Sequence, residues 1–205
     1  MSIELVRMNR MRKALFGLAA LLAAGTAPPV DASTFNRVGL DYLVAENGTI
    51  VVGEVVDARS YWNEGRTFIL TDYRVSVTEV LKGQGAAREI TVTIPGGTVD
   101  DLTARLVGAA DLVPGKWYVL FLDRANMMGA RGLLSVRDHS QGVFDLEMTA
   151  QGLRAVSQAR RHSLRPDARG NGVPVGGGEG MPFTTLIQTV RELADRERGS
   201  RQEVK

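Results

Sequence analysis

The middle of the chain alternates apolar and polar residues with a period of two, which is typical of β-strands with one buried face. The clearest run covers 67–81, and a second covers 89–94. In the first run, one face would carry Ile69, Thr71, Tyr73, Val75, Val77 and Leu81, and the other Asp72, Arg74, Ser76 and Thr78. In the second run, Ile90, Val92 and Ile94 would point inward, and Thr91 and Thr93 outward. Both segments are therefore predicted to be strands with one wet face.

Two other runs have no polar face and are predicted to be strands covered on both sides. They span 49–58 and 117–122, and Gly53 inside the first indicates a bulge or a bend. The segment 99–107 fits either a short strand or a loop.

Three more strands are predicted towards the C-terminus, at 133–136, 142–148 and 153–156. The first two would form a hairpin, with Asp138-His139-Ser140-Gln141 as its turn.

Apolar residues spaced three and four apart predict two helices. The first covers 38–46, where Leu40, Leu43 and Val44 share a face. Asn47-Gly48 after it fits either a helix end or a hairpin turn. The second helix would begin at Pro182, and its apolar stripe contains Phe183, Leu186, Ile187, Val190 and Leu193.

Strands separated by turns, without alternating helices, indicate a mainly β fold. We expect a small closed antiparallel barrel of the OB type with a short N-terminal helix and a C-terminal amphipathic helix, and a β-sandwich is the alternative. The expected organisation is a barrel over 33–160, a flexible Gly- and Arg-rich linker over 161–181, a helix packed on the barrel over 182–198 and a disordered tail over 199–205.

The first 32 residues have the order of a secretory signal peptide. Arg7, Arg10, Arg12 and Lys13 precede an apolar run of eleven residues, 14–24, which is too short to span a membrane. Val30 and Ala32 place cleavage near Ala32/Ser33. We therefore expect an exported, periplasmic or secreted protein without an integral membrane span after processing.

Processing would also change the charge of the chain. Residues 1–32 hold four basic and two acidic residues, so the totals of 25 and 23 become 21 of each. A neutral chain has no general attraction to nucleic acid, and we expect no nucleic-acid partner.

The candidate chemistry is sparse. Cys is absent and His occurs only at His139 and His162, which excludes thiolate chemistry and a three-His metal centre. The only close acidic group contains Asp100, Asp101 and Asp111 and lacks the spacing of a calcium loop. We therefore expect no catalytic residues, no metal and no cofactor. A basic stretch from Arg154 to Arg169 is interpreted as a solvated linker, with contact to an anionic surface as the alternative.

The most promising surface residues lie in the predicted polar loop 59–66. Tyr61, Trp62 and Arg66 are the candidate partner-binding residues there, because Trp and Tyr are frequent at interaction hot spots. The alternative is that Trp62 folds back over one end of the barrel.

Framework motifs suggest a resemblance. They are Ile50–Val56, Tyr73-x-Val75-x-Val77-x-Glu79-Val80-Leu81-Lys82-Gly83, Ile94-Pro95-Gly96-Gly97, Leu112–Leu122 and Gln141–Phe144. They resemble exported bacterial domains of unknown function and, more distantly, the netrin-like barrel of tissue inhibitors of metalloproteinases. That family inhibits through an N-terminal Cys, which this chain lacks. The expected function is a non-enzymatic domain that binds an unknown protein or envelope component. The alternatives are an accessory or inhibitor of secreted proteases and a hydrolase that uses His139.

Overall fold

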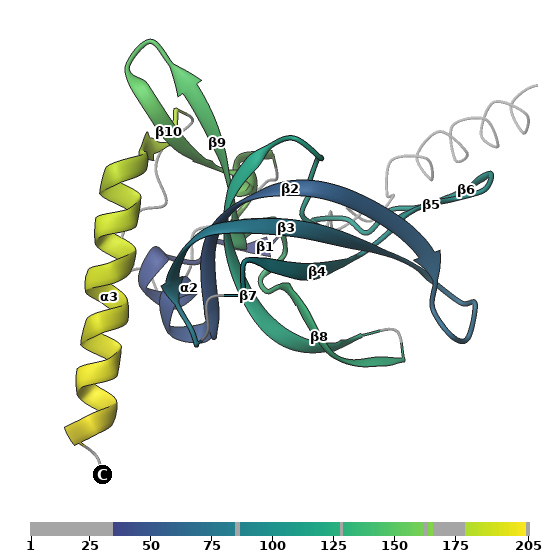
Figure 1. Cartoon of the computed structure of the whole chain (residues 1–205), viewed down its shortest axis with the longest axis horizontal. Coiled ribbons are helices and arrows are strands. Elements are labelled where there is room, and N and C mark those ends of the chain that lie inside the picture. Colours follow the sequence, from purple (N-terminus) through teal and green to yellow (C-terminus); the bar gives the residue numbers. More distant parts are fainter. Residues whose placement is uncertain (1–34, 85–86, 128, 162–163, 166–178, 204–205) are drawn as a thin grey trace, which may run out of the picture. The chain divides into compact units, whose positions relative to one another are not determined.

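The computed structural model describes residues 35–84, 87–127, 129–161, 164–165 and 179–203, which belong to the compact unit Thr34–Lys205. In this part of the chain the fold is mainly β, with one large antiparallel sheet, two α-helices and two small two-stranded sheets (Figure 1). The predicted signal segment 1–32 and most of the predicted linker lie outside the described residues.

The large sheet contains β2 (Thr49–Trp62), β3 (Ile69–Lys82), β4 (Glu89–Pro95), β7 (Trp117–Met127), β8 (Ala130–Val136), β9 (Val143–Thr149), β10 (Gly152–Ser157) and β12 (Met181–Pro182). The small sheets pair β5 (Gly97–Val99) with β6 (Leu102–Ala104), and β1 (Phe35–Asn36) with β11 (Leu164–Arg165). The helices are α2 (Leu40–Glu46), α3 (Phe183–Glu203) and two short 3₁₀ helices, η1 (His139–Gly142) and η2 (Gln158–Arg161).

The strands follow the order β12-β10-β9-β7-β2-β3-β4, and β8 also pairs with β7. Residues 118–120 of β7 pair with β9, whereas residues 122–127 pair with β8. The predicted hairpin between 133–136 and 142–148 is therefore wrong. Because β7 is long, β8 and β9 occupy successive parts of it, and η1 joins them where a hairpin turn was expected.

The mainly β, antiparallel prediction is confirmed, but closure of the sheet into a barrel is not established. β4 and β8 contact each other, and Ser135 Oγ donates a hydrogen bond to the Thr93 carbonyl oxygen at 2.6 Å. No backbone ladder joins these two strands within the described residues. The contact also buries Thr93, which is only 2% exposed and which the alternation placed on a wet face.

The sheet has an apolar core on each face. Helices α2 and α3 cover one face, and the residues buried there include Leu40, Leu43, Val44, Ile50, Val52, Val119, Phe121, Phe144, Leu186, Ile187, Val190 and Ala194. The other face buries Val51, Val55, Val75, Val92, Ile94, Tyr118, Leu120 and Leu122, together with Ala110 and Leu112 from the loop before β7. The prediction that the runs 49–58 and 117–122 are covered on both sides is confirmed for 50–55 and 118–122 and wrong for 56–58 and Trp117, which are exposed.

Two bulges in β3 change which side chains share a face. Val52 pairs with Glu79 while Gly53 pairs with Val77, so Thr78 is an extra residue, and its hydroxyl donates to the Val52 carbonyl oxygen at 3.1 Å. A second shift leaves Leu81 extra. Leu81 consequently packs in the helix-covered core, and its predicted place on the face of Val75 is wrong. A register shift lies at Gly53, as expected, but the extra residue is Thr78 of the partner strand.

Both predicted helices are present. The side-chain amide of Asn47 ends α2 by donating to the Leu43 carbonyl oxygen at 2.8 Å, so this turn is a helix end. Helix α3 contacts α2, β3, β10 and β12, and it continues to Glu203. The helix therefore extends beyond the predicted end at 198 and beyond its apolar stripe.

The close approach of β2 and β3 makes Gly53 necessary. A Cβ at Gly53 would lie 2.6 Å from the Ser76 carbonyl oxygen and 2.8 Å from a Val75 methyl carbon. Gly53→Ala should lower the free energy of unfolding by roughly 1–3 kcal/mol, measured by urea denaturation. Gly199→Ala in α3 meets open space and should instead raise it by about 0.5–1 kcal/mol. Equal effects of the two substitutions would contradict this account of the bulge.

Candidate functional site

A cleft of about 390 Å³ lies where the β5–β6 hairpin meets the loop 105–113. Its walls come from segments that are far apart in the sequence, namely the end of β4, the hairpin, this loop, η1 and η2. The lining side chains with polar groups include Tyr73, Thr98, Thr103, Arg105, Asp111, Ser140, Gln158 and Arg161. The cleft therefore combines donors and acceptors from several elements.

Two glycines hold the hairpin against the sheet. Gly96 and Gly97 have φ angles of 110° and 128°, in the region that other residues rarely adopt. A Cβ at Gly97 would lie 2.4 Å from Ser60 Oγ, so only glycine lets the hairpin approach β2 and β3 this closely. The Thr71 hydroxyl donates to the Gly96 carbonyl oxygen at 2.6 Å and fixes the base of the hairpin.

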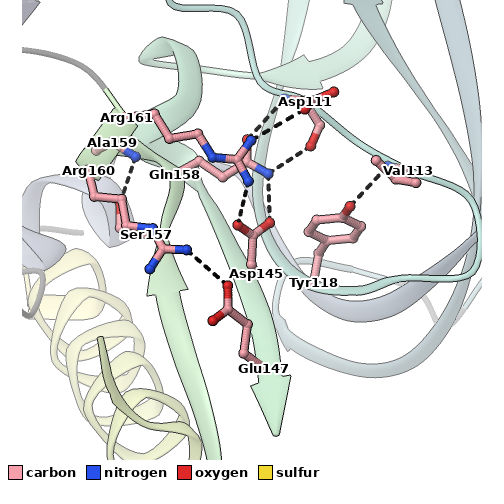
Figure 2. Close-up of polar contacts among 10 residues, drawn as sticks. All are labelled: Asp111, Val113, Tyr118, Asp145, Glu147, Ser157, Gln158, Ala159, Arg160 and Arg161. Carbon is pink, nitrogen blue, oxygen red and sulfur yellow. Dashed lines mark hydrogen bonds and ion pairs between the residues drawn. The ribbon is translucent and has the colours of Figure 1, made fainter. Parts of the chain in front are cut away.

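Gln158 fixes the opposite wall (Figure 2). Its Oε1 accepts the Asp111 backbone N–H at 2.9 Å, and its Nε2 donates to the Asp111 carbonyl oxygen at 2.7 Å. Nε2 also donates to Asp145 Oδ1 at 2.8 Å. Gln158 is 1% exposed and Asp145 8%, so these bonds satisfy polar groups that water does not reach. One side chain thus ties the loop 105–113 to β9 and η2.

Arg161 lies between two carboxylates of unequal exposure. Its Nη2 donates to Asp145 Oδ2 at 3.1 Å and its Nη1 to Asp111 Oδ2 at 3.3 Å (Figure 2). The Asp145 side chain is 12% exposed, whereas that of Asp111 is 70% exposed. The Asp145 contact therefore anchors the guanidinium, and solvent weakens the Asp111 contact.

The solvated-linker interpretation of the basic stretch is wrong for its described first part. Arg160 pairs with Glu147 at 3.0 Å, as Arg161 does with Asp145. Arg154 donates to the carbonyl oxygens of Glu179 and Gly180. These arginines lie on β10 and η2, where neighbouring strands present carboxylate and carbonyl oxygens.

Two tyrosines, the buried Tyr118 and the half-buried Tyr73, lie in or near this region. The Tyr118 hydroxyl accepts the Val113 backbone N–H at 2.9 Å, and burial raises the pKa of Tyr118 to about 12. Burial also raises the pKa of Tyr73, and the nearby Asp111 carboxylate adds to the shift. Both hydroxyls therefore stay protonated at physiological pH.

One exposed aliphatic side chain lines the cleft. Leu106 is 42% exposed, and Leu102 and Val107, which lie close to it in the sequence, are 60% and 66% exposed. An exposed aliphatic side chain beside polar lining groups suits a surface that binds a partner.

The predicted binding residues lie outside the cleft, and two of the three are on a strand. Tyr61 and Trp62 are the last residues of β2 and pair with Leu70 and Ile69. The Tyr61 hydroxyl donates to Asp72 Oδ1 at 3.1 Å, and Trp62 is half-buried. Arg66 is exposed in the turn that follows, with a φ of 50°. The predicted loop 59–66 is therefore wrong for 59–62, where solvent reaches part of β2 and gives it a polar sequence, and confirmed for 63–66.

Asp138 and His139 form a strained turn before η1, with φ angles of 58° and 59°. His139 is exposed, whereas Ser140 is 3% exposed and lines the cleft. Asp138 Oδ2 is buried without a hydrogen-bond partner. Burial raises the pKa of Asp138, Arg137 and His139 partly offset the shift, and Glu46 adds to it.

Sequence reasoning did not find the Asp145–Gln158–Arg161 network. Asp145 occupies a polar position of an alternating strand, and Gln158 has no local pattern. Asp111 was grouped with Asp100 and Asp101, but it contacts Arg161. Among the described residues, no three His, Asp or Glu side chains are placed to hold a metal ion.

Neither protein-family models nor curated proteins match the sequence. Neither α2 nor α3 has the length and hydrophobicity of a membrane-crossing helix, and the described residues contain no other α-helix.

Gln158→Ala should release the loop 105–113. The substitution leaves the Asp111 peptide groups and the buried Asp145 carboxylate without their partner, which should lower the free energy of unfolding by about 3 kcal/mol. Backbone amides of 105–113 should exchange faster in hydrogen-exchange mass spectrometry. Gln188→Ala, on the exposed face of α3, should change stability by less than about 0.5 kcal/mol. Unchanged exchange in Gln158→Ala would refute the role of Gln158 in holding the loop 105–113.

Asp138→Asn should stabilise the protein at pH 7 by about 1 kcal/mol, because a neutral amide carries a smaller burial penalty. With its folded-state pKa raised, Asp138 takes up its proton in the folded protein first as the pH falls. The gain from the substitution should therefore shrink as the pH falls through that pKa and vanish below the unfolded-state pKa. Asp100→Asn is the control, because Asp100 is exposed and has a similar φ of 54°. Urea denaturation between pH 7 and pH 3 measures both, and a pH-independent gain at Asp138 would contradict the burial argument.

Proposed function

We propose that the chain is an exported, non-enzymatic domain that binds a partner protein or envelope component through the cleft between the β5–β6 hairpin and the loop 105–113. One observation carries the proposal. The exposed side chain of Leu106 lines a cleft whose wall Gln158 and Arg161 hold in place, and the exposed Leu102 and Val107 lie close to Leu106 in the sequence. A held wall limits the entropy that binding would cost.

The proposal moves the binding residues away from the turn after β2. The Tyr61 hydroxyl already donates a hydrogen bond to Asp72, so it is less available to a partner. Leu106 and Val107 have no comparable polar anchor and are more exposed. Apolar side chains in such positions gain most from being covered.

The proposal includes the closed OB-type, netrin-like barrel expected from the strand motifs. The contact between β4 and β8 and the bond from Ser135 to Thr93 support closure, because they bring the free edges of the two strands together. Export rests on the order of residues in segment 1–32.

A photo-crosslinking residue at position 106 tests the site. Placed there in the full chain, it should form adducts with a partner in cells that export the protein. Position 56 is the matched control, because Val56 is 41% exposed and Leu106 is 42% exposed. Adducts should be specific to position 106 and should disappear in the Val107→Ser background. Equal adducts at both positions, or none at 106, would overturn the proposal.

A further inference from the structure

One cation in the cleft has no ion-pair partner among the described residues. Arg105 follows β6 and lines the same cleft as Arg161. Unlike Arg161, Arg105 makes no hydrogen bond or ion pair with any residue that the structure describes. Two arginines therefore line one cleft, and one of them has no counter-ion among the described residues.

Arg161 can accept another anion without losing its anchor. The Asp145 contact is largely shielded from water and holds the guanidinium from one side. The Asp111 carboxylate is exposed, and an exposed ion pair contributes only about 0–1 kcal/mol. An incoming anion would therefore compete with Asp111 and leave the Asp145 contact in place.

The charge of the cleft selects the kind of anion. Arg105 and Arg161 are matched in number by the carboxylates of Asp111 and Asp145, so these four charges cancel and every negative charge that a ligand adds is uncompensated. A carboxylate carries one negative charge and matches the forked N–H groups of arginine. A phosphate monoester carries about −1.5 to −2 at neutral pH, and the two aspartates would repel the excess.

We propose that the cleft binds a carboxylate group, which Arg105 and Arg161 hold in competition with Asp111. This inference rests on the proposed binding function of the cleft and gives the chemistry of its ligand. The carboxylate belongs either to an acidic side chain of a polypeptide or to a small free acid. The exposed Leu106 favours the polypeptide, because it follows Arg105 in the sequence, lines the same cleft and would contact apolar neighbours of the acidic residue.

Two substitutions with opposite expected effects test the proposal. Arg105→Gln removes a donor and should weaken binding about fivefold. Asp111→Asn removes the competing charge and should tighten binding about fivefold, since 1 kcal/mol corresponds to roughly that factor. Gln158 bonds to the backbone of Asp111 and not to its side chain, so Asp111→Asn keeps the loop 105–113 in place. Urea denaturation checks that both variants are folded.

The probes are a blocked pentapeptide with a central Asp between two Leu residues, the same peptide with Asn, acetate and inorganic phosphate. Titrations of the ¹⁵N-labelled full chain follow the Nε–H signals of Arg105 and Arg161. The Asp peptide should shift both signals, and its binding should weaken at high salt. The Asn peptide should not bind. Tighter binding of the peptide than of acetate identifies the polypeptide source, and equal binding identifies the free acid.

Three results would overturn the inference. They are weaker binding in Asp111→Asn, equal binding of the Asp and Asn peptides, and stronger binding of phosphate than of either carboxylate. Crosslinking at position 106 without carboxylate binding would overturn only the ligand chemistry. Carboxylate binding without crosslinking would overturn the macromolecular partner and leave the anion site standing.

Discussion

Burial of β2 and β7 on both faces is the constraint that places the other elements of the described fold. Where the two strands pair with each other, over 49–54 and 117–122, neither has a polar face, so each side of the pair must be covered. Helices α2 and α3 cover one side, and β3, β4, β8 and the loop 105–113 meet over the other. The cleft lies at the edge of this second layer, where the hairpin and the loop complete it.

Two buried glutamines extend the order of the sheet into segments without regular structure. Gln158 satisfies both backbone groups of Asp111. Gln141 does the same for the segment after β1, because its Oε1 accepts the Val38 N–H and its Nε2 donates to the Asn36 carbonyl oxygen. Each primary amide supplies one donor and one acceptor, as the edge of a neighbouring strand would.

The sequence predicts the elements that follow from local patterns. Alternation located β3 and β4, and helical spacing located α2 and α3. The sequence does not predict which strands pair, since nothing in it shows that β8 and β9 occupy successive parts of β7. The two bulges in β3 shifted Leu81 to the other face. The charged network was missed for the same reason, because it joins Asp111, Asp145 and Arg161 through tertiary structure alone.

Helices α2 and α3 contribute to the same apolar core, although they are far apart in the sequence. Leu40 and Leu43 lie near the start of the described chain, and Leu186 and Val190 pack in the same cluster from its end. The two helices meet only after the whole sheet separates them in the sequence, so this contact has a high contact order and a large loop-closure entropy. The sheet alone therefore leaves this core incomplete during folding, and its final burial waits for residues 183–203 to pack against α2.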